Sequence, residues 1–132
     1  MQNRFWARPC SAGALSCLFL AAAFGQSSSF QPFRIPLSGT PQSVTAGDFN
    51  GDGFPDLAVA ITDSSGSWFI EMLLGNGDGT FHSLVLTPVA GPVRKVIQAD
   101  FNRDGQLDLA VLTTSLSGQT FVFLGNGDGR QD

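Results

Sequence analysis

The chain has 132 residues, 42% of them hydrophobic, with seven basic and eleven acidic side chains and a net charge of −4 at pH 7. This length allows one small domain. The charge balance is acidic and no basic cluster occurs, which argues against nucleic acid as a partner.

The first 25 residues have the pattern of a secretory signal peptide. Arg4 and Arg8 precede an apolar stretch over residues 12–24, and small residues flank a cleavage point before Gln26. Two alternatives stay open, a membrane anchor and a lipid attached to Cys17. The apolar run is short for a span of about 20 residues, and Cys17 lies in a poor lipidation context. We therefore expect a secreted, periplasmic or cell-surface protein without a membrane span after processing.

The mature chain, residues 26–132, is expected to lack disulfides, because Cys10 and Cys17 both lie in the predicted signal peptide. Residues 26–29 resemble a flexible leader. Phe30–Leu37 alternates imperfectly and contains Pro32 and Pro36, so it is at best an edge strand. Val44–Gly47 then leads into an acidic loop.

This loop, residues 48–56, has the pattern of a calcium site. Oxygen-bearing side chains stand at its positions 1, 3, 5 and 9, a glycine that permits a sharp turn stands at position 6, and position 7 would add a backbone carbonyl. The predicted ligands are Asp48, Asn50, Asp52, Phe54 and Asp56. Oxygen ligands in that number favour Ca²⁺ over Mg²⁺ or a softer metal.

The same loop recurs at residues 100–108, with Asp100, Asn102, Asp104, Gln106 and Asp108 as the predicted ligands. A solvated polar turn is the alternative. However, three carboxylates in one short loop repel each other unless a cation or protons neutralise them. At position 12, where an EF-hand loop has Glu, the two loops have Val59 and Val111. The residues after each loop have the pattern of a strand, whereas a helix follows an EF-hand loop. We therefore expect a calcium loop that joins two strands, with two ions in all.

The segments after the first loop predict strands and tight turns. Residues 57–62 are apolar on both faces, which predicts a strand covered on both sides by stacked sheets. Residues 63–67 form a turn, 68–74 a third strand, 75–79 a hairpin turn and 81–86 a fourth strand.

The series then repeats, with expected strands at 93–99, 109–114 and 120–124 and turns at 115–118 and 125–129. The loops start 52 residues apart, at 48 and 100, and the glycine-rich turns start 50 apart, at 75 and 125. Four short strands in a period of this size predict an all-β fold of β-propeller blades, with repeat one at 43–88 and repeat two at 93–129.

Phe30 precedes the first loop by 18 residues, much as Phe81 precedes the second loop by 19, so Phe30–Leu37 corresponds to the fourth strand of a blade. The first three strands of that blade do not precede it, and repeat two lacks a fourth strand. Two repeats are too few to close a ring of four to eight blades. We therefore expect a fragment of a larger propeller. The alternative is that the spare strand completes a blade in this chain or in a partner chain.

The loops, the Asp-Leu-Ala-Val strands that follow them and the Gly-Asn-Gly-Asp-Gly turns resemble the FG-GAP / VCBS repeat family of integrin-α-like propeller blades. The resemblance covers about residues 30–129. It implies calcium ligands at Asp48, Asn50, Asp52 and Asp56 and at Asp100, Asn102, Asp104 and Asp108. Arg103 replaces Gly51 at loop position 4, which we expect to face outward.

The remaining motifs are expected to be structural. The Gly-Asn-Gly-Asp-Gly turns are too far apart to share ions as in a β-roll, and His82 has the pattern of a surface strand residue. Trp68, Phe69, Phe121 and Phe123 are expected to pack between blades, with carbohydrate stacking on Trp68 as the alternative.

No nucleophile–base pair or phosphate loop occurs. We therefore expect a secreted, calcium-stabilised, non-enzymatic module for adhesion or for recognition of a protein or glycan. The alternatives are an accessory or catalytic part of a secreted carbohydrate-active enzyme, and a lectin-like binder.

Overall fold

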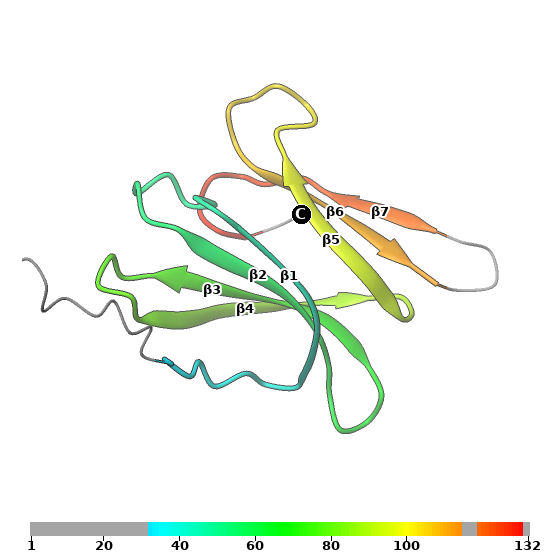
Figure 1. Ribbon diagram of the computed structural model, residues 1–132. Coiled ribbons are helices and arrows are strands. Elements are labelled where there is room, and N and C mark those ends of the chain that lie inside the picture. The colour runs from blue at the N-terminus through cyan, green and yellow to red at the C-terminus, as the bar shows by residue number, and fades with distance from the viewer. Residues whose placement is uncertain (1–31, 115–118, 131–132) are drawn as a thin grey trace, which may run out of the picture. The chain divides into compact units, whose positions relative to one another are not determined.

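The computed structural model describes residues 32–114 and 119–130, which contain seven strands and no helix (Figure 1). The described residues therefore contain no helix that is long and apolar enough to cross a membrane. The predicted signal peptide, the leader, Phe30 and the predicted turn at 115–118 lie outside the described residues. The chain divides into two units, residues 1–33 and 34–132, and the second unit carries all seven strands.

The first sheet is an antiparallel meander of four strands in the order β1-β2-β3-β4. Its strands are β1 (Thr40–Gly47), β2 (Asp56–Thr62), β3 (Trp68–Gly75) and β4 (Phe81–Val89). The predicted strands are confirmed, although β1 begins and β4 ends beyond the expected bounds. This is the architecture of one complete propeller blade.

The second sheet has three antiparallel strands in the order β5-β6-β7. Its strands are β5 (Val93–Ala99), β6 (Asp108–Thr113) and β7 (Thr120–Phe123). Its pairing repeats that of the first sheet. Ala58 lies opposite Met72 in the first sheet, and Ala110 lies opposite Val122 in the second. The all-β prediction is therefore correct, and the described part of the second blade has three strands instead of four.

Local side-chain chemistry closes the turns of the first sheet. Asp63 Oδ1 accepts hydrogen bonds from Ser65 N, Ser65 Oγ and Ser67 N at 2.8, 2.7 and 2.9 Å, which fixes the β2–β3 turn. The β3–β4 turn is closed by a 2.9 Å bond from Asn76 N to Thr80 O. Its predicted role as a hairpin turn is confirmed, and His82 is exposed on β4 as expected.

The main core lies between the two sheets. Residues at alternating positions of β2 and β3 pack against residues of β5 and β6, and Phe121 and Phe123 of β7 close the same cluster. Its buried members are Phe49, Ala58, Ala60, Ile70, Met72, Leu74, Val89, Val93, Val96, Leu109 and Val111. Trp68 is half-buried at the edge of this cluster, so three of the four aromatic residues predicted to pack between blades do so. Phe69 instead packs on the opposite face of the first sheet.

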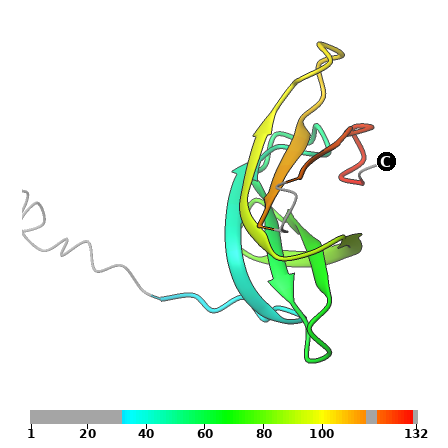
Figure 2. The ribbon, with the colours of Figure 1, turned by 90° about the vertical axis from the view of Figure 1, so that its right-hand side faces the viewer.

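The strands β1 and β5 lie side by side in both ribbon views, although they belong to different sheets (Figures 1 and 2). Side chains join them. Ser43 Oγ accepts a hydrogen bond of 3.1 Å from Val96 N, and Gln98 Nε2 donates to Ala46 O at 2.9 Å. Thr45 Oγ1 also donates to Gln98 Oε1.

The prediction of a strand over Phe30–Leu37 is wrong for the described part of that segment, because residues 32–37 form no strand. Pro36 has no backbone N–H to give to a ladder, and the blade that would pair with this strand is not among the described residues. Residues 34–39 instead lie across a face of the first sheet, and we call them the strap. Ile35 and Leu37 of the strap pack against Val59, Ile61 and Leu73.

Candidate metal centre

The first acidic loop is closed by its own carboxylates. Asp48 Oδ1 accepts hydrogen bonds from the backbone N–H groups of Gly51 and Asp52, and Asp48 Oδ2 accepts one from Gly53. These bonds measure 2.7, 3.2 and 2.9 Å. Asp52 Oδ1 accepts from Phe54 N at 2.8 Å, and Asp52 Oδ2 accepts from Asn50 Nδ2 at 2.7 Å. The side chains at positions 1, 3 and 5 are thereby brought together.

The second loop repeats this arrangement bond for bond. Asp100 accepts from the N–H groups of Arg103, Asp104 and Gly105 at 2.6, 3.1 and 3.0 Å. Asp104 accepts from Gln106 N and from Asn102 Nδ2 at 2.8 and 2.7 Å. Both loops turn through positive φ at positions 4 and 6. Position 6 is glycine in both, with φ of 85° at Gly53 and 88° at Gly105.

Position 4 differs between the loops. Gly51 has φ of 73°, and Arg103 adopts nearly the same backbone with φ of 65°. Among the described residues, Arg103 alone has a positive φ without being glycine. Its side chain is exposed, as expected, but the left-handed backbone costs an L-residue about 1–2 kcal/mol. The second loop therefore keeps the shape of the first despite backbone strain.

The aspartates at position 9 lie in a different environment from the other acids of the loops. Asp56 and Asp108 have no exposed surface, whereas the other carboxylates of the loops are at least partly exposed. Asp56 Oδ2 accepts from Phe49 N at 2.9 Å, and Asp56 Oδ1 accepts from Gly75 N at 2.8 Å. Each buried carboxylate thus ties the start of its loop to the first glycine of the hairpin turn.

Asp108 makes the same two bonds, from Phe101 N and Gly125 N, both at 2.8 Å. The N–H of Gly125 has the largest influence on its pKa and lowers it below the ordinary value of 3.8. Burial acts in the opposite direction, and the N–H of Phe101 adds to the lowering. Asp108 is therefore held as the carboxylate by backbone donors.

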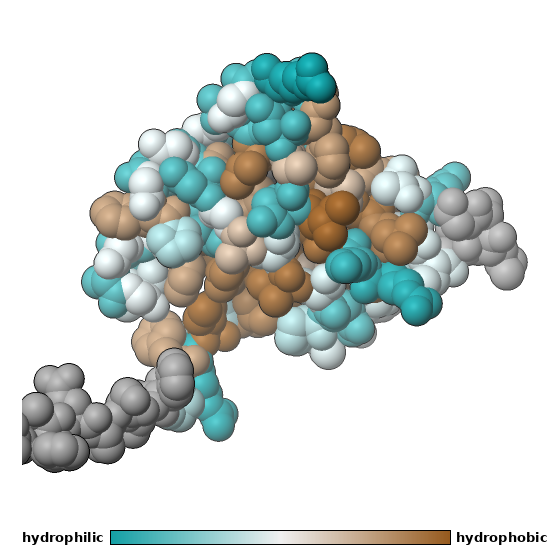
Figure 3. Space-filling view, turned by 45° about the horizontal axis from the view of Figure 1, so that its top comes forward, coloured by the Kyte–Doolittle hydropathy of each residue, from teal (hydrophilic) through white to brown (hydrophobic). Residues whose placement is uncertain are grey.

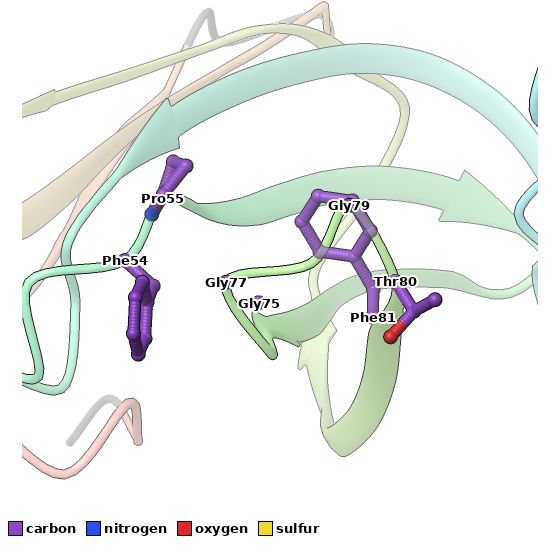
Figure 4. A pocket seen from close by; sticks show the side chains of 7 residues that line it. All are labelled: Phe54, Pro55, Gly75, Gly77, Gly79, Thr80 and Phe81. Carbon is purple, nitrogen blue, oxygen red and sulfur yellow. The ribbon is translucent and has the colours of Figure 1, made fainter.

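The side chain at position 7 lies against the second glycine of the turn. A Cβ on Gly77 would fall 2.5 Å from the ring of Phe54, and a Cβ on Gly127 would fall 2.6 Å from the amide of Gln106. Phe54 also lines a small, mostly apolar pocket with Pro55, Phe81 and the turn residues Gly75, Gly77, Gly79 and Thr80 (Figure 4). Loop and turn are therefore in contact in both repeats.

The donor set is of the right kind for Ca²⁺, because it offers carboxylate, amide and carbonyl oxygens. Asp48 Oδ1 already accepts two hydrogen bonds, but Asp48 Oδ2 and both oxygens of Asp56 accept only one each, so these three oxygens keep a lone pair for another contact. In the described residues, no three groups drawn from His, Cys, Asp and Glu converge closely enough to hold a metal alone. Any ion in these loops would therefore need oxygens besides those of the carboxylates, for which Asn50 or Asn102 and the backbone carbonyl at position 7 are the candidates.

Sequence reasoning missed Gly75 and Gly125, whose N–H groups bind the buried carboxylates. The signal is present in the sequence, since each Gly-Asn-Gly-Asp-Gly turn begins 19 or 17 residues after the position 9 aspartate. The sequence pattern of these turns predicts hairpins and does not by itself show a contact with the acidic loops.

A four-stranded meander, a second sheet that repeats its pairing and a repeated acidic loop between the first two strands of each define a β-propeller-like repeat protein. A family model described as FG-GAP-like repeat matches residues 18–59, and one described as FG-GAP repeat matches residues 40–80. Residues 18–80 thus belong to the FG-GAP repeat family, as the sequence predicts.

The matches contain the first loop and most of the first sheet. The first match begins at residue 18, within the segment predicted as a signal peptide. The second loop lies beyond both matches, and its assignment as a repeat rests on the shared hydrogen bonds and strand register. Neither the curated proteins nor the solved structures contained a match to the chain.

Proposed function

We propose that this β-propeller-like module is exported, binds one Ca²⁺ ion in each acidic loop and serves adhesion or ligand recognition rather than catalysis. The observation that carries the proposal is the repetition of one loop. The two loops keep the same ligand types at positions 1, 3, 5 and 9 and the same hydrogen bonds, while position 4 changes from glycine to arginine. A loop that only needed to be polar would not require acids at the same positions twice.

The loop residues have separate tasks in this proposal. Asp48, Asn50 and Asp52 supply exposed oxygens, and Phe54 supplies its backbone carbonyl. Asp56 adds a buried carboxylate that is already oriented by Phe49 N and Gly75 N. The ion would neutralise the clustered negative charge and connect the loop, through Asp56, to the β3–β4 turn. Asp100, Asn102, Asp104, Gln106 and Asp108 would act in the same way in the second repeat.

The proposed Ca²⁺ is structural. Extracellular modules bind Ca²⁺ with dissociation constants of about 10⁻⁴–10⁻³ M, and we expect the same range here. Because the ion would bind the folded loop only, the melting temperature should rise with calcium concentration.

The test is calorimetric titration of the purified protein with CaCl₂, together with thermal melting in calcium and in chelator. Heat of binding for two sites and a higher melting temperature in calcium are expected. Asp52→Ala and Asp104→Ala should each remove one site. Asp78→Ala is the matched control, because Asp78 is an exposed turn aspartate bound to Thr80 and outside the loops. No heat and no shift in melting would contradict the calcium proposal.

Export and recognition are tested separately. The pattern of residues 1–25 supports export, which N-terminal sequencing of the protein recovered from outside the cytoplasm would check, with Gln26 as the expected first residue. The proposed ligands are a protein or a glycan. A glycan array probed in calcium and in chelator distinguishes a lectin-like binder from a protein-recognition module.

A further inference from the structure

The hairpin turn between β3 and β4 presents an asparagine followed by a glycine to solvent. Residues 76–79 of this turn are all exposed. Figure 3 shows hydrophilic residues toward the margins of one face of the molecule and hydrophobic residues across its middle. Asparagine is a thermolabile residue, because the backbone nitrogen of the next residue can attack its side-chain amide. Glycine has no Cβ to obstruct this attack, so Asn76–Gly77 has the composition of a deamidation site.

The hydrogen bonds around Asn76 fix the orientation of its amide. Thr80 Oγ1 donates its only hydrogen to Asp78 Oδ1 at 2.6 Å. The same oxygen therefore accepts from Asn76 Nδ2, at 2.8 Å. This leaves Asn76 Oδ1 facing the imidazole of His82, 3.0 Å from Nδ1. Because an amide oxygen only accepts, we assign a hydrogen to His82 Nδ1, which donates it to the carbonyl.

The imidazole donor stands where negative charge develops when the carbonyl of Asn76 is attacked. The attack moves the C=O electron pair onto Oδ1, and an N–H group already in place 3.0 Å away stabilises the resulting oxyanion. The attacking group is accessible as well, because the N–H of Gly77 donates no hydrogen bond within the part of the chain that the structure describes. Asn76 thus has both an unengaged nucleophile and a polarised carbonyl.

The chain contains two other Asn-Gly pairs, and each lacks one of these features. In the first acidic loop, Gly51 N donates to Asp48 Oδ1 at 2.7 Å. This nitrogen must give up a charge-assisted hydrogen bond before it can attack Asn50. In the second turn, Asn126–Gly127 has no imidazole beside it, because His82 is the single histidine of the chain.

We propose that Asn76 is a self-modification site, which closes to a succinimide with Gly77 and opens to aspartate or isoaspartate, and that His82 promotes the closure. A solvent base takes the Gly77 N–H proton, the nitrogen bonds to Asn76 Cγ, and the Cγ–Nδ2 bond breaks. The amine takes a proton from water and leaves as ammonia. Water then adds to either succinimide carbonyl and breaks the bond from that carbon to nitrogen. Overall, one water is consumed and one ammonia is released.

The modified residue lies in the contact between the turn and the acidic loop. Gly75 N binds Asp56, and Gly77 lies against Phe54, so the two neighbours of Asn76 both touch the loop. Isoaspartate routes the backbone through Cβ and lengthens it by one carbon between these two glycines, whereas aspartate adds a negative charge and leaves the backbone length unchanged. The inference does not depend on calcium, so it survives a failed calcium titration.

The test is mass-spectrometric peptide mapping of the purified protein after incubation at neutral pH, with digestion at mildly acidic pH to stop the reaction. Cleavage after Glu71, the single glutamate, and after the basic residues places the three Asn-Gly pairs on separate peptides, residues 35–71, 72–94 and 104–130. Each conversion raises the mass of one peptide by the difference between an amide and an acid. The same incubation in urea gives the three rates without tertiary contacts.

In the folded protein, Asn76 should react about tenfold faster than Asn126, since a hydrogen bond that stabilises the transition state by about 1.4 kcal/mol gives this factor. Asn50 should be the slowest of the three. In urea the three rates should become equal. His82→Ala should lower the Asn76 rate about tenfold, to that of Asn126, and leave the Asn126 rate unchanged.

The Asn50 rate reports whether the first loop is still folded in the variant, because it should rise to the urea value when the loop opens. If His82→Ala opens the loop, the comparison of Asn76 with Asn126 in the wild type decides. Equal rates at these two sites in the folded wild type would overturn the proposal. So would an unchanged Asn76 rate in folded His82→Ala, or a rate order that persists in urea, since local sequence alone would then account for it.

Discussion

Asp56 Oδ1 accepts a hydrogen bond of 2.8 Å from the backbone N–H of Gly75, which lies 19 residues further along the chain. With the bond from Phe49 N to Oδ2, this one buried carboxylate fixes both the entry to the acidic loop and the start of the hairpin turn. Removing it would leave two backbone donors without partners in the interior.

We predict that Asp56→Ala lowers the free energy of unfolding by about 3 kcal/mol even in chelator, because an unsatisfied buried group costs roughly 1–3 kcal/mol. Urea unfolding in chelator measures this cost without any contribution from calcium. Asp52→Ala is the control, since Asp52 is exposed and should cost well under half as much under the same conditions. Equal costs for the two variants would show that the buried position of Asp56 does not matter.

Gly77 is predicted to be the most sensitive glycine of the first turn. Alanine there would strain the backbone, which has φ of 77°, and would clash with the ring of Phe54, so we expect a loss of about 3 kcal/mol. Gly79→Ala meets no neighbour and should cost only about 1 kcal/mol from its positive φ. Combining Gly77→Ala with Phe54→Ala should cost less than the sum of the two single changes. Strict additivity in chemical denaturation would contradict the contact.

Arg103→Gly should stabilise the second loop by about 1 kcal/mol, because glycine adopts the left-handed conformation without the clash of a Cβ. The reciprocal change, Gly51→Arg, should destabilise the first loop by a similar amount, since Gly51 has open space around it and only the backbone is strained. Thermal melting of the two variants and the wild type in chelator would compare the loops directly. A loss of stability in Arg103→Gly would mean that the arginine side chain contributes more than the strain costs.

Asp63 is predicted to make stability depend on acid pH. The hydroxyl of Ser65 first, and then the N–H of Ser67, lower the pKa of Asp63 below its ordinary value of 3.8. A lowered pKa in the folded state means that the ionised form stabilises the fold. This contribution is complete above the unfolded pKa and is lost as the pH falls through the lower folded value.

The measurement compares the wild type with Asp63→Asn by urea unfolding across a pH series without added calcium. The wild type should be more stable above about pH 5, and the difference should shrink as the pH falls below 3.8. A difference that stays constant at low pH would assign the effect to the shape of the turn instead of to its charge.

The strands and turns could be predicted from the sequence because each repeat supports the other. The apolar runs after the two acidic loops match β2 and β6, and the Gly-Asn-Gly-Asp-Gly segment correctly predicted the turn between β3 and β4. The start of β1 was missed because Thr40, Pro41 and Gln42 show no strand pattern. Thr40 and Pro41 pair with Thr62 and Ile61 because β2 offers a partner edge, and Gln42 lies at the register shift between Pro41 and Ser43, without a partner in β2.

Two features depend on tertiary contacts that local sequence does not specify. Residues 34–37 alternate like a strand, yet they lie across a sheet face, where Ile35 and Leu37 pack on Val59, Ile61 and Leu73, and no strand in the part of the chain that the structure describes pairs with them. Glu71 is acidic in an apolar strand, and its burial depends on Ser38, which lies 33 residues earlier. The loop ligand types could be predicted, but the burial of Asp56 and Asp108 could not, because it requires the packed hairpin turn.

Among the described residues, the bonds between β1 and β5 use the side chains of Ser43, Thr45 and Gln98, while the backbone ladders run only within each sheet. Gene duplication or deletion can therefore add or remove a whole blade at such a contact between sheets without breaking a backbone hydrogen-bond ladder. The few side chains that connect neighbouring sheets can then change independently at each contact, so that each blade can come to prefer one particular neighbouring blade.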